Sequence, residues 1–182
     1  GQLSGLSDTV FDEIAFGLIN QGMSEEEASK SVVRAACQMG LEDLLEQAPD
    51  TLSGGQTQRL AIASEIAFDP EFLIMDDPTS QMDPVGRKEF FEWLAGCSEK
   101  TIFIVSNEVD DLCEIADQLW VLEKGELIAS GKPLDVINQV AEGRDLYLPV
   151  VYRMAKELGK KLPSGLFPVK LSELKGCFDD QN

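Results

Sequence analysis

The chain has 182 residues, of which 15 are basic and 33 acidic, and its net charge is −18. A field of that sign repels phosphate backbones, which argues against nucleic acid as the main partner, and an anionic membrane surface would not attract the chain directly. Four scattered cysteines and no histidine argue against a zinc site, and no apolar run approaches membrane-spanning length.

The first fifty residues carry the pattern of a helical bundle. Thr9 to Leu18 has apolar residues at helical spacing. Ser24 and Glu27 form a capping box that opens a second helix, and Gly40 ends it. We expect a short third helix over Leu41 to Gln47. Together these segments predict an amphipathic helical bundle.

A glycine pair opens the next helical pattern. The segment reads Leu52-Ser53-Gly54-Gly55-Gln56, and helical spacing then runs from Thr57 to Phe68. Glycine lets backbone N–H groups approach an anion, and a helix N-terminus favours negative charge. The pair therefore indicates either an anion site or a simple turn in which Ser53 caps the helix, and the residues alone leave both open.

A run of four apolar residues, Phe72 to Met75, comes next and is followed by Asp76, Asp77 and Pro78. Such a run is typical of a strand buried on both faces of a parallel sheet. A carboxylate at the carboxyl end of that strand lies where open α/β sheets bind ligands, and it can hold a hydrated Mg²⁺ beside a nucleotide phosphate. The alternative is a polar loop after the strand.

The rest of the chain alternates helices and strands, which predicts an α/β fold with a mainly parallel sheet. The expected helices are Asp83 to Ala95, Val109 to Ala116 and Pro133 to Val140, and the expected strands are Thr101 to Ser106, Gln118 to Leu122 and Glu126 to Ala129. Lys124-Gly125 predicts a hairpin turn between the last two strands. From Arg144 on, a C-terminal helical appendage is expected, with helices over Leu146 to Leu158 and Leu171 to Lys175.

In this order, the two central segments closely resemble the ATP-binding subunits of ABC transporters. Leu52 to Gln56 matches the signature motif of that family, Phe72 to Asp76 its Walker B strand, and Ser80 to Asp83 its D-loop. The resemblance runs from about Thr9 to Gly131. It implies a partial P-loop NTPase fold with three parts: a helical subdomain (1–51), a core that contains the signature and Walker B motifs (52–142), and a C-terminal extension (143–182).

The resemblance also implies an ATP and Mg²⁺ site shared by two subunits. In dimers of the family, each signature motif caps the ATP held by the P-loop of the other subunit. Asp76 would hold Mg²⁺ through water, and Asp83 would lie at the dimer seam. The residues expected to serve the ATP of the partner subunit are Ser53, Gly54, Gly55 and Gln56.

The P-loop pattern G-x-x-x-x-G-K-[ST] does not occur in the sequence. The nearest candidate combines Gly125 with Gly131-Lys132, but its spacing is one residue too long and Pro133 replaces the hydroxyl residue. The family places its P-loop upstream of the signature motif, so we expect that part to precede Gly1. Gln2 is a weak match to the glutamine of the Q-loop. Without a P-loop, the chain alone is expected not to hydrolyse ATP.

Two positions depart from the catalytic pattern of the family. Active members have a glutamate after the Walker B aspartate, and here the shorter Asp77 stands there; a displacement of about 1 Å can cost on the order of 100-fold in rate. The family's switch histidine corresponds to Asn107, which can donate a hydrogen bond but cannot carry a proton. Both changes predict a slow or inactive site, as in the degenerate half of an asymmetric ATPase pair. A homodimer that tolerates Asp77 is the simpler alternative.

Within the family, Thr9 to Gly17 and Gly125 to Ala129 are most similar to the ATPases of energy-coupling factor importers, which take up vitamins and metal ions such as cobalt and nickel. The resemblance implies import of a small solute, a second ABC ATPase subunit and a transmembrane subunit as partners, and a peripheral location on the cytoplasmic face of the membrane. The transmembrane partner docks near the helical subdomain in this family. We nevertheless expect Phe11, Phe16 and Leu18 to fill the core.

Two alternatives belong to other functional classes. One is a soluble ABC protein that acts in repair or translation, which usually needs basic surfaces, and the charge of −18 argues against it. The other is a non-catalytic interaction module.

Overall fold

The computed structural model describes residues 3, 5, 7–142 and 146–179 and divides the chain into two units, Gly1–Ser106 and Asn107–Asn182. Gln2, the Q-loop candidate, lies outside the described residues. Residues 143–145, where the C-terminal extension was expected to begin, lie outside them as well. The division into 1–51, 52–142 and 143–182 stays a prediction.

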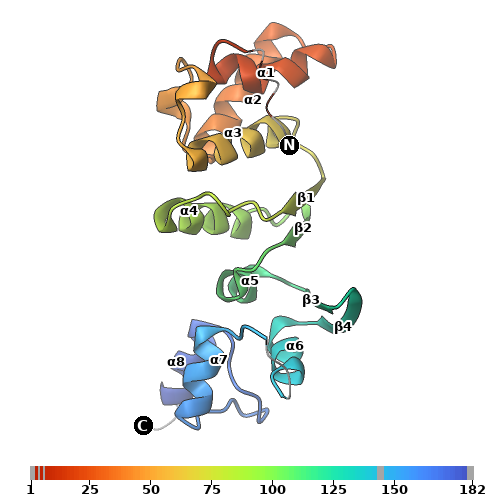
Figure 1. Ribbon diagram of the computed structural model, residues 1–182, viewed down its shortest axis with the longest axis vertical. Helices are drawn as coiled ribbons and strands as arrows, with labels where there is room; N and C mark the ends of the chain where they lie inside the picture. Colours follow the sequence, from red (N-terminus) through yellow and green to blue (C-terminus); the bar gives the residue numbers. More distant parts are fainter. Residues whose placement is uncertain (1–2, 4, 6, 143–145, 180–182) are drawn as a thin grey trace. The chain divides into compact units, whose positions relative to one another are not determined.

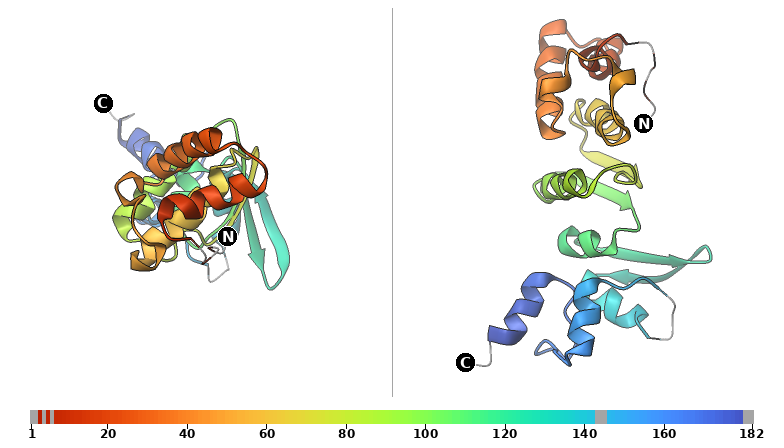
Figure 2. Two further views of the ribbon diagram at one scale, coloured as in Figure 1. Left: turned by 90° about the horizontal axis from the view of Figure 1, so that it is seen from above. Right: turned by 60° about the vertical axis from the view of Figure 1, so that its left-hand side comes forward.

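Three helices of the first unit pack on one another: α1 (Val10–Asn20), α2 (Glu25–Gln38) and α3 (Gly54–Ile66) (Figures 1 and 2). Their shared core is fully buried and consists of Val10, Ile14, Leu18, Val32 and Leu60, among others. The capping box predicted at the start of α2 is confirmed, since the Ser24 side chain accepts from the Glu27 N–H and the Glu27 carboxylate accepts from the Ser24 N–H. The helix of the signature segment is therefore built into the helical bundle.

The third helix expected over Leu41 to Gln47 is wrong in extent. Only Glu42–Leu44 forms a 3-10 turn, and a second one follows at Pro49–Thr51. The carbonyl groups of Leu45 and Gln47 accept hydrogen bonds of 2.9 Å from the N–H groups of Phe11 and Val10, respectively. Within the segment, the Leu44 and Gln47 N–H groups donate three residues back, to the Leu41 and Leu44 carbonyl oxygens, which is the 3-10 pattern rather than that of an α-helix.

The core prediction for the residues of α1 holds for one of the three positions. Leu18 is fully buried, Phe11 is half-buried, and Phe16 is 45% exposed. Phe16 is thus a correction: it lies on the surface of α1, where Ile19 is also exposed. Phe16 is two residues from both Ile14 and Leu18, so at 3.6 residues per turn it lies on the face of α1 opposite these buried side chains.

Two parallel strands form the sheet of the first unit. β1 (Phe72–Asp76) pairs with β2 (Thr101–Val105), and α4 (Pro84–Ala95) connects them and lies to one side of the pair (Figure 1). Asp69, just before β1, has a backbone φ of 53°. Lys100 Nζ stabilises this turn, because it donates a hydrogen bond of 2.7 Å to Asp69 Oδ1 and one of 2.9 Å to the Pro70 carbonyl oxygen. This hydrogen bond is the main cause that lowers the pKa of Asp69.

The expectation that β1 is buried on both faces is wrong for the described structure. Leu73 and Met75 are buried, whereas Phe72 and Ile74 are 56% and 70% exposed. Successive side chains of a strand point to opposite faces, so one face of β1 is covered and the other is open. No element within the described ranges covers that second face closely enough to bury it.

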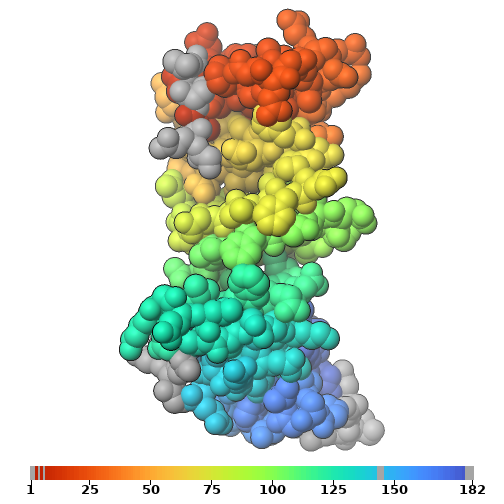
Figure 3. Space-filling view, turned by 90° about the vertical axis from the view of Figure 1, so that its right-hand side faces the viewer, coloured from red at the N-terminus to blue at the C-terminus, as the bar shows by residue number. Residues whose placement is uncertain are grey.

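The second unit begins with α5 (Val109–Ile115) and a hairpin of β3 (Leu119–Glu123) and β4 (Glu126–Gly131). The predicted turn is confirmed: Lys124 and Gly125 have φ of 51° and 84°, as two-residue hairpin turns require. This second pair is antiparallel, so parallel pairing is confined to β1 and β2 among the described strands. Figure 3 shows the hairpin, in blue-green, at the surface of this unit.

The C-terminal helices share a core with α5 and α6 (Pro133–Val140). α7 (Val150–Glu157) supplies Tyr152, which packs with Cys113, Ile137 and Val169. The Val150 N–H also donates to Asp110 Oδ1 at 2.6 Å, and the first N–H of α8 (Leu171–Asp179) donates to Glu114 Oε1 at 2.8 Å. The segment after residue 145 is thus part of the packing of the second unit. None of the described helices is long and apolar enough to cross a membrane.

The buried thiol of Cys113 gives a chemical test of this core. Burial, together with the nearby Asp110 and Glu114 carboxylates, raises its pKa to about 12 from the ordinary 9.0. Its thiolate fraction at pH 8 should therefore be roughly a thousandfold smaller than that of an ordinary thiol. We expect iodoacetamide to label the exposed Cys37 readily and to spare Cys113, as read by peptide mass spectrometry.

Denaturant should bring the labelling rate of Cys113 up to that of Cys37. Folding raises the pKa of Cys113, because the core favours the neutral thiol over the thiolate. The stability that this preference gives the folded chain is therefore present below pH 9.0 and is lost as the pH rises toward about 12. Equal labelling of the two thiols in the native chain would contradict the core described for the second unit.

Candidate functional site

The glycine pair lies at the N-terminus of α3 and Ser53 is its N-cap. The Ser53 Oγ accepts from the Gln56 N–H at 3.4 Å, and the Gln56 Oε1 accepts from the Ser53 N–H at 2.8 Å. Thr57 reinforces the turn, since its N–H and Oγ1 donate to the Ser53 carbonyl oxygen at 2.8 and 3.0 Å. The interpretation of Ser53 as a cap is therefore confirmed. A cap leaves the N–H groups of Gly54 and Gly55, at the first two helical positions, without carbonyl partners inside the helix, so the anion-site interpretation is compatible with it.

An open pocket of about 440 Å³ lies over this helix end. Its lining is Ser53, Gly54, Gly55, Gln56, Arg59, Gln81 and Asp83. The structure thus brings together the four predicted signature residues and the predicted D-loop aspartate within the first unit. Sequence reasoning missed two of the lining residues. Arg59 stands one helical turn after Gln56, on the same face of α3, and this spacing is the signal that could have identified it.

The side chain of Arg59 contacts both α4 and the turn at Gly40. Its Nη1 lies 3.6 Å from Glu89 Oε2 on α4, and its Nε is buried without a hydrogen-bond partner among the described residues. The side chain also lies over the Gly40 turn, where an added Cβ would be 3.3 Å from Nη1. Arg59 therefore places a positive charge on the pocket side of α3, and this charge is paired with Glu89.

The D-loop, Ser80 to Asp83, ends a segment of tight turns that begins at Asp77. The Asp77 N–H donates to the Val105 carbonyl oxygen of β2 at 2.8 Å. Two turns follow, in which the Ser80 and Met82 N–H groups donate to the Asp77 and Thr79 carbonyl oxygens at 3.2 and 3.0 Å. At the far end, Asp83 Oδ1 accepts from the Gly86 N–H at 2.9 Å and caps α4. Both ends of the loop are therefore fixed to regular elements.

The predicted catalytic and metal-binding residues lie beside this loop or in the other unit. Asp76 is exposed at the end of β1, and Asp77 is half-buried with φ of 49°, a left-handed conformation that aspartate tolerates better than most residues. Neither residue is among the described residues that line the pocket. Asn107 is exposed at the beginning of the second unit. Within the described ranges, no group of three histidine, cysteine, aspartate or glutamate side chains is arranged to hold a metal ion.

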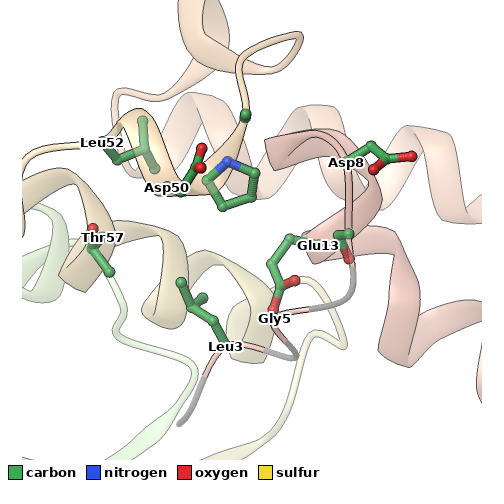
Figure 4. A pocket seen from close by; sticks show the side chains of 10 residues that line it. Leu3, Gly5, Asp8, Glu13, Asp50, Leu52 and Thr57 are labelled. Atoms are coloured by element: carbon green, nitrogen blue, oxygen red, sulfur yellow. The ribbon is translucent and has the colours of Figure 1, made fainter.

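A second open pocket, of about 540 Å³, lies between the start of α1 and the segment that leads into α3. Figure 4 shows Asp8 and Glu13 on the α1 side of this pocket, and Asp50, Leu52 and Thr57 on the α3 side. All charged side chains in the described lining are acidic, and Glu13 is only 6% exposed. This pocket adjoins the signature segment but has no feature that would attract an anion.

The cap of α4 gives a direct test of the D-loop geometry. Asp83→Ala removes the acceptor for the Gly86 N–H and should lower the free energy of unfolding by about 1 kcal/mol. Asp83→Asn keeps an acceptor oxygen, so it should lower the free energy of unfolding by much less than Asp83→Ala does. Chemical denaturation of both variants checks the expectation. If both variants unfold as the unaltered chain does, Asp83 does not cap α4.

The sequence is similar to ATP-binding proteins of transporters. The family described as "ABC transporter" matches residues 5–80. Curated relatives include the energy-coupling factor transporter ATP-binding protein EcfA2 of Streptococcus pneumoniae serotype 2 and the protein of the same name from Streptococcus pyogenes, each 38% identical over 174 residues. The match spans 92% of this chain and 62% of each relative, so the chain covers less than two thirds of their length.

Solved structures agree with the sequence matches. CbiO1 from Clostridium perfringens, described as part of the ABC transporter complex cbiONQ, is 30% identical with a TM-score of 0.68, and the match covers 90% of this chain and 61% of that one. The dimeric ABC transporter cassette MJ0796 is 27% identical with a TM-score of 0.65, and the match covers 72% of this chain and 59% of that one. With its signature helix, Walker B strand and mixed α/β fold, the chain belongs to the ATP-binding domains of ABC transporters and is close to the energy-coupling factor ATPases.

Proposed function

We propose that this chain supplies the signature-motif side of an ATP site shared between two ABC ATPase subunits, which drives import of a small solute such as a vitamin or a metal ion. The observation that carries the proposal is the open pocket over the N-terminus of α3. The N–H groups of Gly54 and Gly55 lack carbonyl partners inside the helix, and a helix N-terminus favours negative charge. The side chain of Arg59, whose Nη1 lies 3.6 Å from Glu89 Oε2, adds a positively charged group to the same lining.

The residues of the pocket fit one face of a nucleotide rather than all of it. Ser53 offers a hydroxyl, Gly54 and Gly55 offer backbone N–H groups, and Gln56 supports the turn through its side chain. No P-loop pattern occurs in the sequence, so the phosphates need a cradle from elsewhere. Such a cradle would come from the P-loop of a second ABC ATPase, and this chain alone should not hydrolyse ATP.

The remaining assignments follow the same proposal. Asp76, exposed at the end of β1, would hold Mg²⁺ through water, and Mg²⁺ would supply charge neutralisation at the phosphates. Asp77 would be a weak catalytic carboxylate and Asn107 a hydrogen-bond donor to the γ-phosphate. Asp83 would face the dimer seam through the part of its carboxylate that does not cap α4.

We further propose that the pair is asymmetric and that this chain carries the degenerate site. Asp77 is shorter than the glutamate of active members, and Asn107 cannot accept a proton in the way a histidine does. The intact capping box at Ser53 supports a chain that still completes the site of its partner. A homodimer that tolerates Asp77 remains the alternative that the test below separates.

A transmembrane subunit would bind the first unit near α1, and the chain would then lie on the cytoplasmic face of the membrane. Phe16 and Ile19 of α1, 45% and 42% exposed, support this placement because they leave apolar surface for a partner. The acidic pocket between Asp8, Glu13 and Asp50 would suit basic side chains of that partner. A soluble role in repair or translation has no support from a basic surface, given the net charge of −18.

Gln56→Glu tests the proposed nucleotide contact without disturbing the fold. A capping box accepts glutamate as well as glutamine at this position, so stability should be retained. The new carboxylate would face the phosphates, and two like charges at about 4 Å repel by roughly 4 kcal/mol at an effective dielectric constant of 20. We expect ATP-dependent association with a P-loop-containing ABC ATPase to weaken by at least about tenfold.

The association is measured by light scattering with a slowly hydrolysed ATP analogue. Gln118→Glu adds the same charge at an exposed position of the second unit and should leave association unchanged. An unchanged ATP dependence for Gln56→Glu would contradict the signature-side assignment.

Substitutions at Asp77 test whether the two ATP sites of the pair differ in activity. If the partner's site carries most of the turnover, Asp77→Asn in the assembled pair should leave at least about half of the steady-state ATP hydrolysis, because the substitution removes only a site that is already slow. Asparagine also tolerates the left-handed backbone at this position, so the loop is preserved. Asp77→Ala should behave in the same way apart from a small loss of stability. If either change alone abolished turnover in a correctly folded pair, the degenerate-site proposal would be wrong.

A further inference from the structure

Gln81 is a residue of the D-loop that contacts the signature glycines of the same chain. An ideal Cβ added to Gly54 would lie 2.9 Å from the Gln81 Oε1, so the side chain of Gln81 lies directly over the α-carbon of Gly54. An ideal Cβ on Gly55 would lie 3.1 Å from the Gln81 carbonyl oxygen. Gln81 is itself exposed and lines the same pocket as Ser53 and Arg59.

The contact at Gly55 involves backbone on both sides. A carbonyl oxygen cannot turn away as the end of a side chain can, so a side chain at Gly55 would require the D-loop backbone and the helix to move by a few tenths of an ångström. The glycine pair therefore has a structural function within this chain, in addition to any function toward a nucleotide. Gly55 allows the two segments to meet, and the Gln81 side chain covers the meeting point.

The backbone of Gln81 is held in place from both directions along the chain. Toward the N-terminus, the hydrogen bond between the Asp77 N–H and the Val105 carbonyl oxygen fixes the D-loop to the end of β2. Toward the C-terminus, Asp83 caps α4. The turn closed by the Met82 N–H and the Thr79 carbonyl oxygen lies between them and contains Gln81. The backbone of Gln81 therefore lies between two hydrogen-bonded anchors, one at the end of β2 and one at the start of α4.

We propose that Gln81 is a positioning residue that sets the orientation of the Ser53–Gly55 turn relative to the carboxyl end of β1. It acts by packing: its side chain and carbonyl group confine the first turn of α3, so that the hydroxyl and N–H groups of that turn keep one direction. The structural part of this inference needs no ligand. Its consequence for ATP rests on the proposed function.

Amide hydrogen exchange in the 182-residue chain tests the structural part. The informative amides are those of Gln56 and Thr57, which donate to Ser53 and close the first turn. We expect Gln81→Ala to speed their exchange by about fivefold, because local opening no longer has to displace the covering side chain. Gln81→Met, which keeps the length of the side chain, should exchange like the unaltered chain. Gln118→Ala, the same kind of truncation at an exposed site of the other unit, should have no effect.

A double-variant cycle locates the contact. A methyl group at Gly54 displaces the end of the Gln81 side chain, so Gln81→Ala should have little further effect on exchange in a Gly54→Ala background. Gly55→Ala meets the backbone carbonyl group, so its effect should persist in the Gln81→Ala background. Unchanged exchange in Gln81→Ala, or full additivity with Gly54→Ala, would overturn the proposal.

ATP kinetics of the assembled ATPase pair separate this proposal from the proposed function. Gln81→Ala should raise the KM for ATP about tenfold with kcat within about twofold, as expected when a binding contact loses its orientation. If Gln56→Glu raises KM and Gln81→Ala does not, Gln81 has no positioning effect, although the signature-side assignment holds. If neither variant changes KM while Gln81→Ala still speeds exchange, the signature-side assignment fails and Gln81 orients the turn for another purpose.

Discussion

The approach of the D-loop backbone to Gly55 is the constraint on which the site depends. The signature helix belongs to the helical bundle through Leu60, while the D-loop follows β1 and is fixed to β2. Only a residue without a side chain lets the Gln81 carbonyl oxygen come as close to α3 as it does. The capping box then sets the direction of the exposed N–H groups. A different residue at Gly55 would require the D-loop backbone to shift by a few tenths of an ångström, and this shift would move the side of the pocket that Gln81 lines.

Local chemistry in the sequence was enough to predict the features that depend on a few neighbouring residues. The capping box at Ser24, the N-cap at Ser53 and the hairpin turn at Lys124-Gly125 occur where the sequence predicts them. Each of these features satisfies its hydrogen bonds within four residues, so no distant segment can override it. The signature residues and Asp83 could also be placed in advance, because the motif order matches a known family, although their roles toward ATP remain proposals.

The features that the sequence did not predict depend on what packs against them. Ile74 lies in an apolar run that suits a strand covered on both sides, yet it is 70% exposed, since strand periodicity does not say which neighbours are present. Phe16 is a different case, because helical spacing itself places it on the face of α1 opposite the buried Ile14 and Leu18. The helix expected after Gly40 is reduced to a 3-10 turn, and the residues after this turn are tied to the start of α1 through the carbonyl groups of Leu45 and Gln47. Gln81 could not be found from its own residue type, because its significance comes from an approach to two glycines more than twenty residues earlier.

The strong negative charge of the chain is compatible with the proposed contact with a polyanion, because most of the acidic residues are too far from the contact to act on it strongly. At physiological ionic strength the Debye length is about 8 Å, so most of the 33 acidic residues act only weakly on an anion at the end of α3. The N–H groups of Gly54 and Gly55 would act at hydrogen-bond distance, where salt screens little, and Arg59 adds a positive charge in the same lining. Asp83 is the one carboxylate among the described residues of that lining, and the cap of α4 engages one of its oxygens. The local field over α3 can therefore be favourable to phosphate while the chain as a whole repels it, and the proposed phosphate contact would then depend on the orientation of the Ser53–Gly55 turn.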